Sequence, residues 1–169
     1  MGTQREDFAD FYRQSKDECL MTVLVSVGDR DTAQELVAEA FARAWASWWR
    51  VSQHPAPRAW VVRTALNESI SRWRRRRREV AVADPGLVAD VAATDGAGLV
   101  DPRLMAALLR LPARQRQVVA LRLFMDFDTG RTASVLKIAP GTVQAHLGRA
   151  LAALREDLTT QPSRSTADE

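Results

Sequence analysis

Arginine is concentrated in one short segment, where residues 72–78 hold six arginines and one tryptophan. Five consecutive like charges at 74–78 repel one another, so the run indicates either a solvated helix end or phosphate contact, and we favour phosphate contact. A second basic block, residues 102–155, carries nine basic and two acidic side chains. Of the 24 basic residues 22 are arginine, but a coding preference for arginine does not explain the clustering. Two basic blocks predict two contacts with a polyanion.

Metal and nucleophilic chemistry have few candidate residues in this chain. Cys19 is the only cysteine, and His54 and His146 are the only histidines, so Cys and His cannot form a tetrahedral zinc site. Neither histidine belongs to a motif with a nucleophile or a carboxylate, and we expect no catalytic site, metal or cofactor. A lone thiol suits a reducing compartment. The longest apolar stretch, residues 20–27, is too short to span a bilayer. We therefore expect a cytoplasmic protein that is not an enzyme and does not insert into membranes.

The elements that position the first basic block are predicted to be helices. Apolar residues at spacings of three and four predict one helix from about Asp7 to Gly28. Thr32 followed by Glu35 predicts a capping box that opens a second helix. Prolines interrupt residues 51–57, and a third helix is predicted over 58–73, leading into the arginine run. Together these elements predict a first helical domain over residues 7–78.

Residues 79–100 have no basic side chain and no sustained periodicity, which predicts a flexible acidic linker. Short helices are predicted beyond it over 102–109, 112–124, 128–136 and from 140 to 158. The turn at 137–139 gives the last two the dimensions of a helix-turn-helix. No segment alternates like a strand, so the predicted fold is all-α, with a second small domain over 101–158. The tail, residues 159–169, is expected to be disordered.

The order of these motifs resembles a known family. Residues 111–122 (LPARQRQVVALR), 140–143 (PGTV) and 149–155 are similar to region 4 of bacterial RNA polymerase sigma factors of the extracytoplasmic-function (ECF) type. Residues 31–41 and 60–67 (WVVRTALN), with the arginine run, resemble region 2 of the same family. The resemblance implies promoter-specific transcription initiation, with core RNA polymerase and promoter DNA as partners, an anti-sigma factor as a possible inhibitor, and a free protein that is monomeric.

The resemblance also implies roles for individual residues. Polymerase binding would fall to Glu35, Leu36, Val37 and Glu39. The minus-ten element would be contacted by Trp60, Arg63, Asn67, Arg74 and Arg75, and read by Gln53 and His54 in the loop before the third helix, because unstacked bases are held by aromatic faces beside cations. The minus-thirty-five element would meet exposed side chains of the last helix, namely Thr142, Gln144, His146 and Arg149. For tryptophans the alternative is burial in the core, which we favour for Trp45 and Trp48 and leave open for Trp60 and Trp73.

Five positions depart from the family pattern, and four of them fall in the helix-turn-helix. They are Ala38 for glutamine, Arg131 for an acidic residue, Lys137 for glycine, Ala139 for serine or aspartate, and Gln144 for a basic residue. A side chain at the left-handed turn position costs about 1 kcal/mol, and a missing cap oxygen costs roughly 1 kcal/mol more. We therefore expect weaker or altered minus-thirty-five recognition.

Two alternatives to a functional sigma factor remain open. One is a degenerate relative that binds polymerase without selecting promoters, which the altered turn could suggest. The other is a helix-turn-helix regulator that binds operators without polymerase. Such regulators usually dimerise on paired half-sites, and the chain turns polar after Leu158, which disfavours a dimerisation helix.

Overall fold

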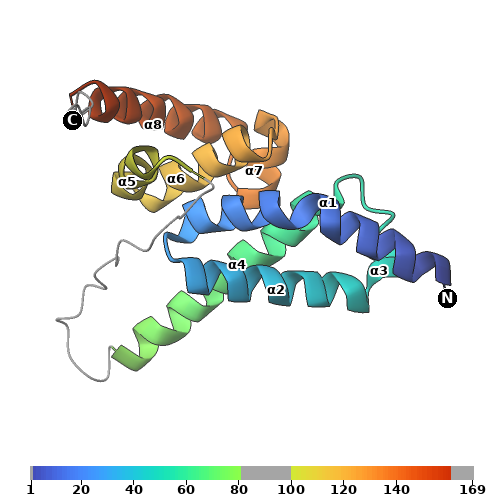
Figure 1. Cartoon of the computed structure of the whole chain (residues 1–169). Helices are drawn as coiled ribbons and strands as arrows, with labels where there is room; N and C mark the ends of the chain where they lie inside the picture. The colour runs from blue at the N-terminus through green and yellow to red at the C-terminus, as the bar shows by residue number, and fades with distance from the viewer. Residues whose placement is uncertain (1, 81–99, 161–169) are drawn as a thin grey trace, which may run out of the picture.

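The computed structural model describes residues 2–80 and 100–160 (Figure 1). Every regular element in this part of the chain is helical, as predicted: α1 (Gly2–Val27), α2 (Arg30–Ala46), α3 (Trp48–Val51), α4 (Pro57–Val80), α5 (Pro102–Arg110), α6 (Ala113–Val119), the π-helical turn η1 (Ala120–Phe124), α7 (Thr129–Leu136) and α8 (Pro140–Thr160). None of these helices is long and apolar enough to cross a membrane. Most of the predicted linker and tail, residues 81–99 and 161–169, lie outside the described residues.

Helix α2 starts one turn earlier than the sequence predicts. The chain leaves α1 through Gly28, whose φ of 82° suits a residue without a Cβ. Asp29 then caps α2, and its carboxylate accepts a hydrogen bond from the Thr32 backbone N–H at 2.8 Å. The predicted capping box at Thr32 is therefore wrong, because Asp29 already satisfies that N–H and Thr32 lies within the first turn.

The N-terminal half is a helical bundle of α1, α2 and α4, closed at one end by aromatic rings. Phe11 packs on Trp48 with ring centroids 5.0 Å apart, and Tyr12 meets the edge of Phe41 at 4.9 Å. Trp48 is buried, as expected, but Trp45 is 47% exposed. The expectation that Trp45 belongs to the core is wrong, because nearly half of the residue is exposed while its ring packs on Phe8 at the rim.

The C-terminal half places its last two helices around a tight turn. Asp128 caps α7 through the Arg131 backbone N–H at 2.7 Å. Lys137 ends α7 with φ 55° and ψ 48°, which confirms the predicted left-handed conformation at this position. Ala139 accepts the first backbone hydrogen bonds of α8, from Thr142 and Val143, but offers no side-chain oxygen to the helix. The predicted helix over 112–124 is instead α6 followed by η1.

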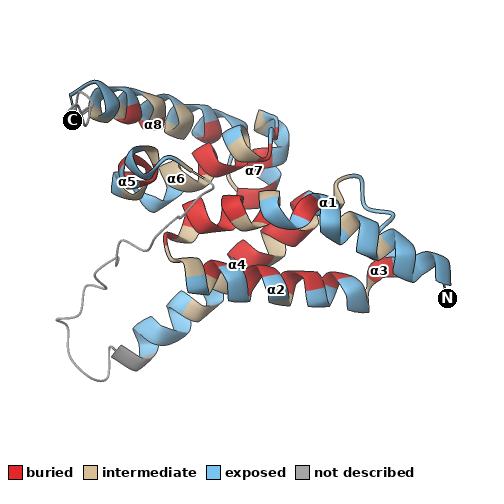
Figure 2. Cartoon of the chain, in the orientation of Figure 1, coloured by how far each residue is buried: buried red, intermediate tan, exposed pale blue. Residues whose placement is uncertain are grey.

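The two halves share one hydrophobic core (Figure 2), in which buried residues continue from α2 and α4 through α1 into the C-terminal half. Helix α1 packs against α6 and η1, and α4 packs against α7. A polar contact reinforces this interface, where the Arg116 Nε donates to the Ser26 carbonyl oxygen in the last turn of α1 at 3.2 Å. Arg116 also donates to the Leu109 carbonyl oxygen at 3.2 Å. One guanidinium thus ties the C-terminal half to the end of α1.

Candidate nucleic-acid and polymerase-binding surfaces

A groove of about 460 Å³ runs between the end of α2 and the start of α4. We call it the α2–α4 groove, and its lining residues are Arg43, Ala46, Ser47, Arg50, Trp60, Thr64 and Asn67. The groove combines one half-buried indole, one exposed amide and two guanidinium groups. An aromatic face beside cations is suited to a stacked base and its phosphates. Arg43, Arg50 and Thr64 escaped the sequence reasoning. Arg43 lies on α2 and Arg50 on the short helix α3, and the break at Ser47 between these helices means that no single helical periodicity links the two arginines.

The loop before α4 presents two polar side chains to solvent. Gln53 and His54 are both exposed. The Ala56 backbone N–H donates to His54 Nδ1 at 3.0 Å. Because Nδ1 accepts this bond, the neutral ring carries its proton on Nε2, which is left as a donor. The loop can therefore offer one oriented imidazole donor and one amide.

Arg63 lines a different cavity from the α2–α4 groove. This second cavity, of about 350 Å³, also has His54 and Trp60 on one wall and Asp128, the N-cap of α7, and Arg131 of α7 on the other. The predicted minus-ten residues therefore divide between two surfaces, with Trp60 on both. In this arrangement the C-terminal half stands over part of the surface expected to read DNA.

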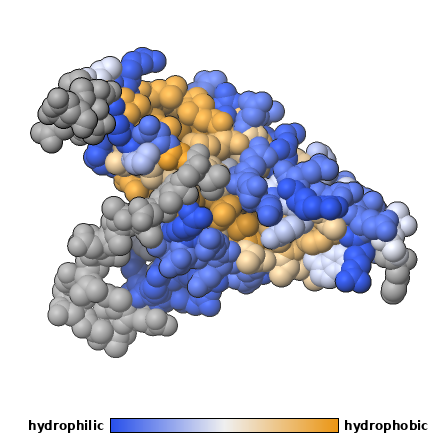
Figure 3. Space-filling view, in the orientation of Figure 1, coloured by the Kyte–Doolittle hydropathy of each residue, from blue (hydrophilic) through white to orange (hydrophobic). Residues whose placement is uncertain are grey.

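The end of α4 carries the arginine run into solvent, and Figure 3 shows a continuous hydrophilic surface there. Arg74 is exposed, and Arg75 is exposed while pairing with Glu68 at 3.0 Å. Trp73 is 52% exposed, and the Arg77 guanidinium lies 4.7 Å from its ring centroid. Trp73 is therefore a surface residue that pairs with a cation, which answers the question that its sequence context left open.

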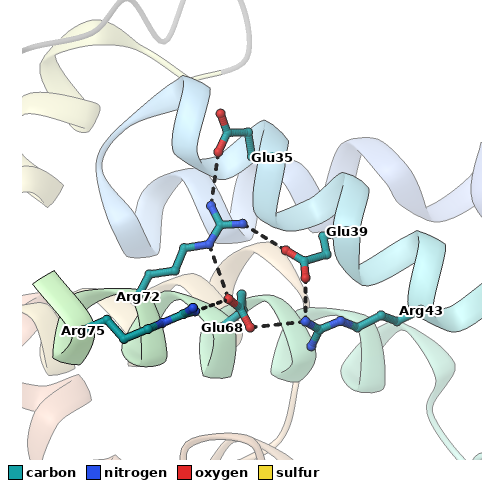
Figure 4. Close-up of polar contacts among 6 residues, drawn as sticks. All are labelled: Glu35, Glu39, Arg43, Glu68, Arg72 and Arg75. Carbon is teal, nitrogen blue, oxygen red and sulfur yellow. Dashed lines mark hydrogen bonds and ion pairs between the residues drawn. The ribbon is translucent and has the colours of Figure 1, made fainter.

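A network of three carboxylates and three guanidinium groups joins α2 to α4 (Figure 4). We call it the α2–α4 ion network, and its members are Glu35, Glu39, Arg43, Glu68, Arg72 and Arg75. Partial burial acts to raise the pKa of Glu68, but the attraction of Arg43, Arg72 and Arg75 outweighs it and the pKa is lowered from its ordinary value. Burial likewise opposes the charge of Arg72, yet its bonds to Glu35, Glu39 and Glu68 raise its pKa. Glu68 and Arg72 therefore both remain charged near neutral pH.

The residues expected to bind polymerase do not share one exposed face. Leu36 is fully buried and Val37 is buried in the core of the N-terminal half. The expectation that these two side chains face the polymerase is wrong in this structure, because they belong to the apolar stripe that holds α2 against its neighbours. Glu35 and Glu39 are accessible, although both bind Arg72, and their polymerase role stays a prediction.

Helix α8 exposes three of the four side chains expected at the minus-thirty-five element. Thr142, Gln144 and Arg149 are exposed. His146 is half-buried instead of exposed, and its Nδ1 is buried without a hydrogen-bond partner among the described residues. The expectation that His146 is an exposed contact is therefore corrected, because the ring leans into the protein instead of standing clear of α8.

Nothing in the described residues suggests metal or thiol chemistry. These residues contain no group of three or more His, Cys, Asp or Glu side chains placed to hold a metal ion. Burial, with a smaller contribution from Glu18, raises the pKa of the Cys19 thiol to about 12. Cys19 is therefore a neutral, buried thiol near neutral pH.

Comparisons with known proteins agree with this architecture. The family model for Sigma-70 region 2 matches residues 20–79, and that for Sigma-70 region 4 matches residues 102–154. The RNA polymerase sigma-E factor of Streptomyces antibioticus is 32% identical over 157 residues, covering 92% of this chain and 86% of the relative. The ECF RNA polymerase sigma factor SigL of Mycobacterium tuberculosis is 32% identical over 76% of this chain and 75% of its own length.

A solved structure extends the likeness to three dimensions. The sigma factor RpoE of Bartonella quintana, crystallised in complex with the anti-sigma factor NepR, superposes with a TM-score of 0.78 at 25% identity, covering 93% of this chain and 99% of that one. The two region models occur in the same order as the two helical halves. The chain therefore belongs to the ECF group of RNA polymerase sigma factors, whose general role is to direct promoter-specific transcription initiation.

Proposed function

We propose that this chain binds core RNA polymerase and selects promoters with two surfaces of different construction. The α2–α4 groove and the 52–56 loop hold single-stranded minus-ten bases, while α8 meets the duplex at the minus-thirty-five element. The observation that carries this proposal is the groove, which places Trp60 and Asn67 beside Arg43 and Arg50. This combination suits a base held by stacking and amide contacts, with its phosphates neutralised by arginine.

The two halves have to separate when both elements are bound. Elements centred about 25 base pairs apart lie roughly 85 Å apart along B-DNA. A compact body of this chain length has a radius of gyration of about 15 Å, and so a diameter of roughly 40 Å. The chain between residues 80 and 100 can reach about 70 Å when extended, and the halves supply the rest. Promoter binding would therefore break the contacts of α1 with α6 and of α4 with α7.

Partners beyond DNA follow from the same proposal. Glu35 and Glu39 offer carboxylates on α2 to basic groups of the polymerase, and Ala38 between them supplies no polar group. The Bartonella quintana relative was solved with an anti-sigma factor, and we extend this class of partner to the present chain. Its place of action would then be the cytoplasm, where polymerase and chromosome are found.

A second candidate is a polymerase-binding protein that has lost minus-thirty-five selection. The left-handed Lys137 and the uncapped Ala139 favour it, because both weaken the entry to the recognition helix. This candidate shares the polymerase contact with the first proposal and differs from it in lacking promoter specificity.

Run-off transcription with core RNA polymerase tests the proposal. The templates are genomic fragments that include the region upstream of this protein's own gene, each assayed with and without the full chain. Discrete transcripts that require the protein support the proposal. Polymerase binding without transcripts favours the second candidate, and DNA binding without polymerase binding would show that the chain acts as an operator-binding regulator.

A further inference from the structure

Helix α4 continues well beyond the core that anchors it. Among the α4 residues whose burial the structure describes, residues 57–78, the last buried side chain is Leu66, and no side chain from Asn67 to Arg78 is buried. We call residues 67–78 the α4 extension. Figure 1 shows α4 projecting past α2 toward its C-terminal end. A solvated helix end of this length gains little from hydrophobic packing, so another interaction has to fix its direction.

Arg72 supplies that interaction and uses every nitrogen of its guanidinium. Nη1 lies 3.1 Å from Glu35, Nη2 lies 2.9 Å from Glu39, and Nε lies 3.4 Å from Glu68. Two of these carboxylates belong to α2 and one to α4. Arg43 of α2 closes the network by contacting Glu39 at 2.5 Å and Glu68 at 3.3 Å. A planar guanidinium with fixed N–H directions is suited to such a bridge, while an ammonium group is a single point charge.

The arginines of the extension consequently separate into two groups. Arg72 and Arg75 pair with acidic side chains. Arg74 is exposed, and it lies seven residues beyond Asn67, a spacing that places both on one face of α4. Trp60 precedes Asn67 by the same interval. The direction of the extension therefore sets where Arg74 stands relative to the α2–α4 groove.

We propose that Arg72 is a positioning residue for promoter DNA, which holds the α4 extension against α2 and so aligns the exposed Arg74 with the groove. This inference rests on the proposed function for its DNA readout, but the positioning of the extension does not depend on it. Glu35 and Glu39, the predicted polymerase contacts, are the α2 anchors of the same bridge. The surface expected to meet polymerase is thereby linked to the surface expected to meet the minus-ten strand.

The alternative is that Arg72 binds a phosphate directly. Lysine can substitute for Arg72 in only one of these two roles. It still neutralises a phosphate, but it cannot bridge three carboxylates in three directions. The informative variants are R72K and R72Q. The matched controls are R74K and R74Q, which change an exposed arginine of the same extension.

The first measurement is amide hydrogen exchange in the free full-length chain. We expect R72K and R72Q to speed amide exchange in residues 67–78 by about tenfold, because the charge-assisted hydrogen bonds of Arg72 are lost. Exchange in residues 59–66 should remain unchanged. The double variant E35Q/E39Q should give the same pattern, and R74K and R74Q should not. Wild-type exchange rates in R72K across the extension would overturn the proposal.

The second measurement is run-off transcription by the holoenzyme. We expect R72K and R72Q to lose about tenfold in transcript. At Arg74, a predicted DNA contact, R74K should lose less transcript than R74Q because lysine keeps the charge. Wild-type activity in R72K with a loss in R72Q would assign a phosphate contact and overturn positioning. If the wild-type chain gives no transcripts, the proposed function fails, and hydrogen exchange alone decides whether Arg72 positions the extension.

Discussion

The surface proposed for DNA in the N-terminal half is a groove between two long helices, whereas the surface proposed in the C-terminal half is one helix behind a strained turn. The α2–α4 groove is flanked by ion pairs and by a core that includes Val62 and Leu66. Helix α8 is entered through Lys137 at φ 55° and begins at Ala139 without a side-chain cap. The groove is therefore the preorganised surface. The recognition helix keeps two unfavourable local features, the left-handed Lys137 and the missing cap at Ala139, which the residues usual in the family would avoid. We expect promoter selection to depend mainly on the N-terminal half.

The largest expected effect is at the groove. W60A should lower run-off transcription by about tenfold or more, because stacking of a base on an aromatic ring contributes about 1–3 kcal/mol. W60F should keep part of the activity, since a ring remains.

Trp49 gives the matched control for this prediction. Trp49 is 63% exposed and does not line the groove, so W49A removes an indole without touching the proposed base site. Thermal unfolding of all three variants shows whether the fold is intact. Equal transcription by W60A and W49A would contradict the role of the groove.

The contact between the halves gives the next effect. R116A removes the hydrogen bonds to the Ser26 and Leu109 carbonyl oxygens, and hydrogen bonds from a charged group contribute about 1.5–3 kcal/mol when partly buried. We expect the equilibrium to shift toward separated halves by about tenfold, seen as a larger radius of gyration in small-angle scattering. R114A is the control, because Arg114 is exposed and its bond within the described part of the chain is to Gln117 of the same helix, α6. An unchanged radius in R116A would show that apolar packing alone holds the halves together.

A smaller effect is expected at the helix-turn-helix. K137G should raise the free energy of unfolding by about 1 kcal/mol, because glycine adopts the left-handed conformation without the Cβ clash. The midpoint of thermal unfolding should rise by about 2–4 °C. K137A retains the Cβ and should not gain this stability, so equal midpoints for the two variants would refute the explanation.

The smallest effect is expected at the start of α8. A139S places a hydroxyl where it can accept a hydrogen bond from the first-turn N–H groups, which adds about 0.5–1 kcal/mol. A139V supplies a larger, apolar side chain without the oxygen and should give no gain. Denaturant unfolding compares the two variants, and stabilisation by both would point to packing instead of capping.

Local sequence patterns predicted the helices and the turn, because periodicity and caps act over a few residues. The left-handed conformation of Lys137 was predicted instead from the family resemblance, because the family has glycine at this turn position. The cap of α2 was missed because Asp29 and Thr32 are both acceptable caps, and only the observed start of the helix distinguishes them. The apolar stripe of α2 also signalled that Leu36 is buried, but the family resemblance assigned it to polymerase.

Contacts between distant residues could not be predicted in the same way. The pairs that Arg72 forms with Glu35 and Glu39 join residues 37 and 33 positions apart, and no local rule specifies them. The position of α7 over His54 and Trp60 also depends on how the two halves pack. The arginine run predicted a cationic surface, but its division into paired and exposed side chains required the structure.

The most direct test of this comparison is transcription from one mapped promoter with block substitutions in either element. Holoenzyme containing the full chain is assayed on the intact template, a minus-ten substitution and a minus-thirty-five substitution. We predict that the minus-ten substitution abolishes the transcript, while the minus-thirty-five substitution lowers it by about tenfold or less, in line with mismatch costs of about 1–3 kcal/mol. Dependence on the minus-thirty-five bases as tight as on the minus-ten bases would contradict the account.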